Sequence, residues 1–249
     1  MINSTTRFSD RVADYINYRP KYPPEIIGIL KEHIHLTPQS IIADVGAGTG
    51  FLTELFLKNE NHTYAVEPND AMRIACGELY GIYPNLEIIN GTAEATTLPD
   101  NTIDIIVAGQ AFHWFNQEAC KEEFKRILKP DGYIALIWNA RKDDTGFSKG
   151  YDEILRQHLP EYKTLDHRNV DDNAITRFFQ PQQMKKTILP NSQVFNWEGF
   201  KGRALSSSYV PKNGEIHHTI MKEIRKLFDQ YQQDGKVSFL YDTVIYWNA

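Results

Sequence analysis

The segment from Asp44 to Phe51 (DVGAGTGF) places three glycines within five residues, between an apolar run and a helical pattern. Glycine lets the backbone turn tightly and lets a ligand approach the main chain, and a helix that starts there offers unpaired N–H groups. The segment therefore predicts a strand–turn–helix unit that binds a ligand at the turn. A dinucleotide-binding turn has the spacing G-x-G-x-x-G. Here Gly50 comes one position early, which argues against a nicotinamide dehydrogenase.

Short apolar runs alternate with helical patterns through the middle of the chain. Strands are predicted at residues 41–45, 63–66, 86–89, 103–107 and 133–138, and helices at 23–34, 49–57, 69–80 and 120–128. The run at 133–138 is apolar on both faces, which is typical of a central parallel strand covered by helices. A turn is predicted at Lys129–Gly132. This alternation predicts an α/β fold with a doubly wound sheet.

Two regions lie outside this pattern: residues 1–35, which contain a tyrosine-rich segment, and residues 140–210, which are polar and aromatic with few clear periods. Long excursions of this kind usually build pocket walls. An amphipathic helix at 216–231 and closing β structure at 237–241 and 243–247 follow. We predict one domain over 1–249, with its core at about 36–139, closing strands within about 185–249, and a small cap from 1–35 and about 140–210.

The composition narrows the range of partners. Lys and Arg total 27 against 32 Asp and Glu, so the net charge is −5, which argues against a nucleic-acid partner. Cys76 and Cys120 lack the spacing of a disulfide framework and predict buried thiols in a reducing compartment. With no apolar stretch at the N-terminus and no membrane-length run, we expect a soluble, cytoplasmic protein that does not bind membranes. No His, Cys and Asp residues have metal-ligand spacing, so no metal is expected.

The glycine turn, with an acid two residues before its first glycine, resembles motif I of the class I S-adenosylmethionine (SAM)-dependent methyltransferases. The resemblance continues through residues 91–94, 98–104, 108–115 and 123–132, and covers about 41–139. It implies a Rossmann-like seven-stranded sheet, mostly parallel with an antiparallel last strand and with helices on both faces. It also implies SAM as cofactor and S-adenosylhomocysteine (SAH) as product.

The resemblance also implies roles for individual residues. An acid such as Glu67, 23 residues after Asp44, can accept the hydroxyls of a ribose, although the same holds for NAD. The implied cofactor-binding residues include Gly46, Gly48 and the Gln110 backbone around the methionine portion, and Asp44 near its ammonium or bracing the loop. Glu67 would hold the ribose, Met72 would lie against the adenine, Ala93 and Glu94 would meet the adenine edge, and Tyr18, with Tyr15, would form a lid. Ala47 and Pro68 complete the set.

Residues 18–23 together with 112–115, and residues 197–200 running on to 206–209, resemble a small-molecule, type 11-like branch that includes trans-aconitate-type carboxyl methyltransferases. This resemblance specifies no substrate. We expect a small-molecule acceptor, with a carboxylate as one candidate. His113 is either a general base for a hydroxyl or amine acceptor or a residue that orients the pocket. A carboxylate acceptor needs no base, and Arg19 or Arg141 would then matter more.

Other functions remain open. A nucleic-acid methyltransferase that acts on amino groups usually carries Asn/Asp-Pro-Pro-aromatic after its fourth strand, to hold a flipped base. This chain has Gly109-Gln110-Ala111-Phe112 there, and its net charge is −5. A protein methyltransferase and a non-catalytic SAM-binding module are further alternatives. The sequence allows either a monomer or a homodimer.

Overall fold

The computed structural model describes residues 12–163, 172–207 and 209–248, so residues 1–11, 164–171 and 208 of the predicted cap lie outside the described residues. The described chain forms a seven-stranded sheet in the order β3-β2-β1-β4-β5-β7-β6. The strands are β1 (Ile42–Val45), β2 (Thr63–Val66), β3 (Leu86–Ile89), β4 (Ile103–Gly109), β5 (Leu128–Arg141), β6 (Met184–Phe195) and β7 (Val237–Asn248). The helices are α1 (Val12–Tyr18), α2 (Ile26–Ile34), α3 (Thr53–Lys58), α4 (Asp70–Tyr80), α5 (Gln117–Ile127), α6 (Gly146–His158), α7 (Asp172–Phe179), α8 (Trp197–Leu205) and α9 (Gly214–Tyr231), with short 3₁₀ helices η1 (Phe112–Trp114) and η2 (Pro160–Lys163).

The pairing of the strands confirms the predicted sheet. Strands β1 to β5 pair in parallel, whereas β7 runs antiparallel to both β5 and β6. The strand order reverses between β1 and β4, and the register places Asp44 of β1 beside Val107 of β4. In open α/β sheets a ligand crevice forms at such a reversal, outside the carboxyl ends of the strands. The glycine turn follows β1 at this position.

Helices cover both faces of the sheet, as predicted, because successive side chains of each buried strand point to opposite faces. On β5, Leu136 joins a cluster with Phe124 of α5, whereas Ile137 joins a different cluster with Leu30 of α2. The predicted helix near the C-terminus is α9, the longest described helix at 18 residues. Within the described ranges, no helix is long and apolar enough to cross a membrane.

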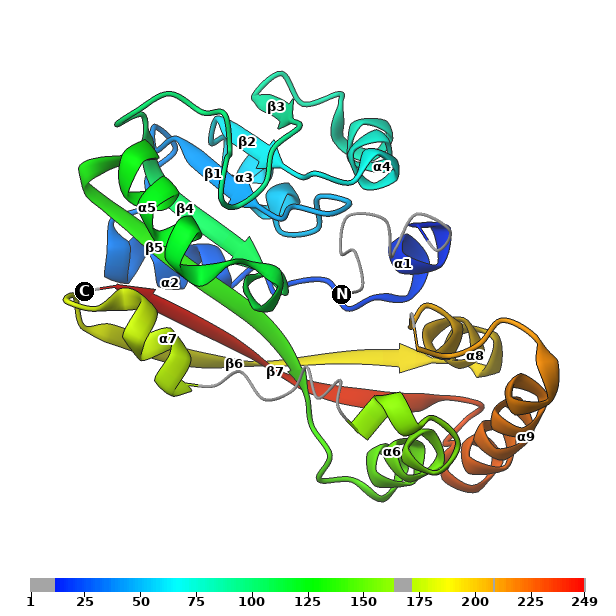
Figure 1. Cartoon of the computed structure of the whole chain (residues 1–249). Helices are drawn as coiled ribbons and strands as arrows, with labels where there is room; N and C mark the ends of the chain where they lie inside the picture. Colours follow the sequence, from blue (N-terminus) through cyan, green and yellow to red (C-terminus); the bar gives the residue numbers. More distant parts are fainter. Residues whose placement is uncertain (1–11, 164–171, 208, 249) are drawn as a thin grey trace.

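A second body of structure lies beyond the parallel core. Strands β6 and β7 are long and extend past it, and α6, α8 and α9 surround their far ends (Figure 1). Phe200 of α8, Phe239 of β7 and Tyr151 of α6 form the centre of a separate apolar cluster there. We call α6, α8, α9 and residues 192–195 and 237–241 the distal lobe. Helix α1, far away in the sequence, packs against α8 of this lobe.

The structure sharpens three details of the predicted elements. Strand β6 lies where the stretch expected to be irregular (140–210) overlaps the range predicted to hold closing strands (about 185–249). It is an edge strand, where Pro190 and alternating polar residues are tolerated, so its sequence shows little apolar alternation. The predicted turn at 129–132 belongs to β5, as a bulge between the pairs Ile103–Leu128 and Ile105–Tyr133. The two predicted closing segments are one continuous strand, β7.

Candidate active site

The glycine turn folds against the segment that follows β4. The N–H groups of Gly46 and Ala47 donate to the carbonyl oxygen of Val66 at 2.8 and 3.1 Å. Gly46 has a φ of +72°, and a Cβ atom built on it would lie 2.6 Å from the Cβ of Ala111. Both the left-handed backbone and the close approach require glycine at this position. The turn thereby brings the carboxyl ends of β1, β2 and β4 together.

Two cavities, of about 180 and 240 Å³, open at this end of the sheet. They share six lining residues, which come from α1, the glycine turn, the end of β4 and the segment after it: Tyr15, Gly46, Gly48, Gly109, Gln110 and Trp114. Because they share these walls, we treat them as two halves of one site. Together they fall within the range of about 300–1,000 Å³ that is typical of small-molecule pockets.

The second cavity contains most of the predicted cofactor-binding residues. Those that line it without lining the first cavity are Glu67, Pro68, Met72, Ala93 and Glu94. Glu67 is held at the turn, because its two carboxylate oxygens accept hydrogen bonds from the N–H groups of Gly48 and Asn69, each at 2.9 Å. Burial raises the pKa of Glu67.

Two further contacts shape the second cavity. The Asn69 side chain accepts a hydrogen bond from the Met72 N–H at 3.0 Å and so caps α4, which fixes Met72 in the first turn of the helix. Glu94, also in the lining, accepts from the Asn116 N–H at 2.7 Å, just before α5. The cavity therefore combines apolar walls with two fixed carboxylates, which suits a flat ring joined to a sugar.

Asp44 forms a buried carboxyl in the wall of the first cavity. One of its oxygens accepts a hydrogen bond from the Thr53 hydroxyl at 2.6 Å, while the other has no hydrogen-bond partner among the described residues. The nearby Thr49 hydroxyl is also buried without such a partner in the described chain. Burial raises the pKa of Asp44 from 3.8 to about 7. This end of the cavity is suited to a cationic donor, such as an ammonium group.

Three arginines line the first cavity, and Arg141 is the one whose charge is compensated by a carboxylate. Its guanidinium forms an ion pair with Asp152 and donates to the Tyr162 hydroxyl at 3.1 Å. It also lies 4.9 Å from the ring centres of both Tyr151 and Phe239. Arg141, predicted as a cation for a carboxylate acceptor, is thus in the cavity wall, but Asp152 compensates its charge.

Arg19 and Arg203 have a different environment. The Arg19 guanidinium donates to the Ser206 carbonyl oxygen at 3.3 Å and lies 5.5 Å from the centre of the Tyr15 ring. Arg203 of α8 is 7% exposed and donates to the Ser207 hydroxyl at 3.2 Å. In the described part of the chain, neither guanidinium forms an ion pair with a carboxylate. Burial and the charge of Arg203 both lower the pKa of Arg19.

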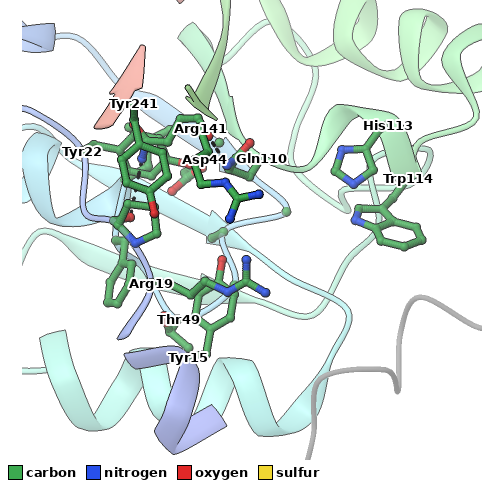
Figure 2. A pocket seen from close by; sticks show the side chains of 18 of the residues that line it. Tyr15, Arg19, Tyr22, Asp44, Thr49, Gln110, His113, Trp114, Arg141 and Tyr241 are labelled. Atoms are coloured by element: carbon green, nitrogen blue, oxygen red, sulfur yellow. Dashed lines mark hydrogen bonds between the residues drawn. The ribbon is translucent and has the colours of Figure 1, made fainter. Parts of the chain in front are cut away.

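His113 and Tyr18 lie at the margins of the site. His113 is exposed on η1, with its ring 4.9 Å from that of Trp114, and it lines the first cavity. Figure 2 shows both rings apart from the group formed by Asp44, Arg19 and Arg141. Tyr18 lines neither cavity. Its ring packs against α8, where a Cβ built on Gly202 would lie 2.2 Å from it, and Tyr15 of the same helix lines both cavities instead.

Sequence reasoning missed Arg203 and Asn139. Asn139, near the end of β5, donates to the Lys21 carbonyl oxygen at 3.4 Å and accepts from the Thr243 hydroxyl at 2.5 Å, which ties the N-terminal segment to the sheet. A signal for Asn139 was available, because it is a polar residue that directly follows an apolar parallel strand. Arg203 belongs to no motif that marks its role. Tyr162, Tyr209 and Tyr241 also line the first cavity.

Comparisons with known proteins agree with this architecture. Residues 43–136 match the family model described as a methyltransferase domain. An uncharacterized methyltransferase-like protein of Schizosaccharomyces pombe is 32% identical, over 96% of this chain and 93% of its own. An uncharacterized methyltransferase of Mycobacterium tuberculosis is 31% identical, over 74% and 76%. A structure from Anaeromyxobacter dehalogenans, provisionally assigned as a type II methyltransferase, shares the fold with a TM-score of 0.68 and 19% identity, over 93% of this chain and 97% of its own. From its kinship with the Schizosaccharomyces pombe protein over nearly the whole length, this chain belongs to the methyltransferase family.

Proposed function

We propose that this protein is a SAM-dependent methyltransferase that acts on a small-molecule acceptor, and that the accepting atom is a carboxylate oxygen. The observation that carries the proposal is the pairing of the two cavities. One cavity has the walls of a nucleoside site. The other, joined to it at the glycine turn, is lined by the guanidinium groups of Arg19 and Arg203, neither of which has a carboxylate partner among the described residues. The resemblance of residues 18–23 and 112–115 to a branch that includes carboxyl methyltransferases supports the same choice.

The residues present fit SAM. Glu67 retains lone pairs for ribose hydroxyls, and Met72, Ala93 and Glu94 offer an apolar surface and a polar edge to the adenine. The oxygen of Asp44 that has no hydrogen-bond partner among the described residues can accept from the α-ammonium group. Gln110 has a positive φ of 55°, and its side chain donates to the Asn139 carbonyl oxygen at 3.2 Å, which fixes it where the two cavities meet.

When bound, SAM supplies a methyl group already activated on a sulfonium sulfur. The remaining task of the protein is to hold the acceptor in line, about 3 Å from the methyl carbon. Transfer to a carboxylate oxygen would form a C–O bond as the methyl–sulfur bond broke with its electron pair going to sulfur. A carboxylate has no proton to lose, so the protein would need no base. Arg19 holds the carboxylate, Tyr15 and Trp114 exclude water, and His113 orients the rim.

The test is a transfer assay with methyl-labelled SAM and matched small carboxylic acids, phenols and amines, followed by mass identification of the product. We expect methyl esters, which release methanol in mild base, from at least one acid. Transfer confined to phenols, amines, nucleic acid or protein would reject the carboxylate acceptor. SAH bound by the protein without transfer to any acceptor class would favour a non-catalytic module. Absence of SAH binding at millimolar concentration would reject the cofactor assignment itself.

A further inference from the structure

Arg73 is a partly buried cation beside the proposed ribose site. It lies near the start of α4, and its side chain is 15% exposed. Its Nη1 donates to the main-chain carbonyl oxygen of Glu67 at 2.8 Å, and its Nη2 forms an ion pair with Asp70. The planar guanidinium group is fixed in one position when it donates to two partners in this way. Arg73 therefore ties the start of α4 to Glu67, the residue that follows β2.

The surroundings of Glu67 favour its neutral form, and Arg73 opposes them. Burial raises the pKa of Glu67, whereas the charge of Arg73 lowers it. Asp44 of β1, Tyr15 of α1 and Cys76 of α4 also interact electrostatically with Glu67. Each of these three groups is either neutral or negative, so none of them stabilises a carboxylate. The field that favours the ionised carboxylate comes from Arg73.

The ionised form of Glu67 is the form suited to bind a ribose. Its two oxygens already accept hydrogen bonds from the N–H groups of Gly48 and Asn69. A carboxylate has further lone pairs for two ribose hydroxyls, whereas the proton of a neutral carboxyl takes one of these acceptor positions. Protonation of Glu67 would therefore weaken ribose binding. The charge of Arg73 is then most important at acid pH, where Glu67 begins to bind a proton.

We infer that Arg73 is a positioning residue of the cofactor site, which fixes the main chain of Glu67 and keeps its carboxylate ionised for the ribose hydroxyls at mildly acid pH. This inference rests on the proposed function. It differs from a purely structural role in one measurable way. Loss of a structural contact lowers the affinity for the nucleoside equally at every pH, whereas loss of the charge lowers it increasingly as pH falls.

The experiment measures the binding of methylthioadenosine by calorimetry at pH 8 and at pH 5.5, with circular dichroism to show that each variant is folded. This nucleoside has the adenine and ribose of SAM but lacks the amino-acid portion, so it has no ammonium group for Asp44. In Arg73→Gln, we expect the ratio of the affinity at pH 8 to that at pH 5.5 to increase about three- to tenfold over the wild type. Comparison with the wild type at each pH cancels the titration of Asp44.

Three further variants separate the charge of Arg73 from its contacts. Arg73→Lys retains the charge and should retain the ratio of the wild type, even if its affinity is lower at both pH values. Asp70→Asn removes the partner of Arg73 but leaves the cation, so the ratio should equal that of the wild type or fall below it. Lys31→Gln, an equal loss of charge at an exposed position on α2, is the control and should match the wild type.

Two results for Arg73→Gln would overturn the inference: affinity that falls equally at both pH values, and affinity that does not change. If this variant does not fold, Arg73→Lys and Asp70→Asn decide, because a loss confined to pH 5.5 in either of them would reject the role of the charge. A failure of the proposed function looks different, because the wild type would then bind neither methylthioadenosine nor SAH at either pH, which would overturn both proposals.

Discussion

The two halves of the site are built in different ways. In the strand-end half, which is the second cavity, the contacts join residues close in sequence. Glu67 accepts hydrogen bonds from Gly48, 19 residues away, and from Asn69, two residues away. In the distal half, which is the first cavity, Arg19 contacts Ser206 across 187 residues. The strand-end half forms from single turns at the ends of parallel strands, whereas the distal half forms only when α1 packs against α8. The proposed cofactor site is thus a property of the sheet, and the proposed acceptor site depends on the docking of remote elements.

The largest effect is expected from Glu67→Ala, which acts on the strand-end half. The substitution removes the acceptor for two backbone N–H groups and for the ribose hydroxyls. Since hydrogen bonds to a charged group contribute about 1.5–3 kcal/mol each, SAH affinity should fall about 10- to 100-fold. Calorimetric titration with SAH measures it. Glu87→Ala, an exposed position on β3, is the control and should bind SAH normally. Unchanged affinity in Glu67→Ala would place the nucleoside outside the second cavity.

The same difference explains how much of each half could be predicted from the sequence. The glycine turn, Glu67 and Glu94 come directly after strands with clear apolar patterns, so their convergence at one edge of the sheet could be inferred from these patterns alone. Strand β6 could be placed only broadly, within about 185–249, since an edge strand with Pro190 shows little alternation. Arg203 could not be predicted, because its role depends on where α8 lies relative to α1. The predictable residues are those that regular strand geometry brings together.

The second prediction breaks the distal half alone. A Cβ on Gly202 would lie 2.2 Å from the Tyr18 ring, so Gly202→Ala forces the Tyr18 ring or α8 itself to move and loosens the contact between α1 and α8. We expect a loss of about 1–3 kcal/mol in the free energy of unfolding. The kcat/KM for the acceptor should fall about tenfold or more, because the acceptor is displaced. SAH affinity should change less than about threefold, since Glu67 and Glu94 lie outside this contact.

Thermal unfolding, SAH titration and methyl transfer are compared for this variant. Gly77→Ala on α4 is the matched control, because its added Cβ would meet Ile88 at an ordinary 3.5 Å. Equal losses of SAH affinity and acceptor turnover in Gly202→Ala would show that the two halves do not act separately.

The third prediction uses pH to test whether Asp44, which lines the first cavity at the glycine turn, binds the ammonium group of the cofactor. Burial raises its pKa from 3.8 to about 7, so the folded protein holds this proton more tightly than the unfolded chain. The contribution of Asp44 to stability is therefore present below about pH 4 and is lost as pH rises through 7. A bound ammonium group favours the ionised form. SAH affinity should accordingly rise about tenfold from pH 6 to pH 8.

Calorimetry across this range measures the effect, and Asp44→Asn should remove the dependence on pH. Thr53→Ala is a useful companion variant, because Thr53 donates to Asp44 and its loss should move the transition to higher pH. A flat profile in the wild type would mean that the ammonium lies away from Asp44.

The smallest effect is expected from His113→Ala, which tests whether the reacting group of the acceptor lies beside His113. A general base contributes about 10²- to 10⁴-fold, but a carboxylate acceptor has no proton to lose. We therefore expect kcat to change less than about twofold, well below that contribution, with an unchanged pH profile. His218→Ala, an exposed position on α9, is the control for a lost imidazole. A 100-fold fall in kcat with loss of its pH dependence would instead indicate a hydroxyl or amine acceptor at the exposed rim. The reacting group would then lie at the rim of the first cavity beside His113, and Arg19 and Arg203 would only anchor the rest of the acceptor.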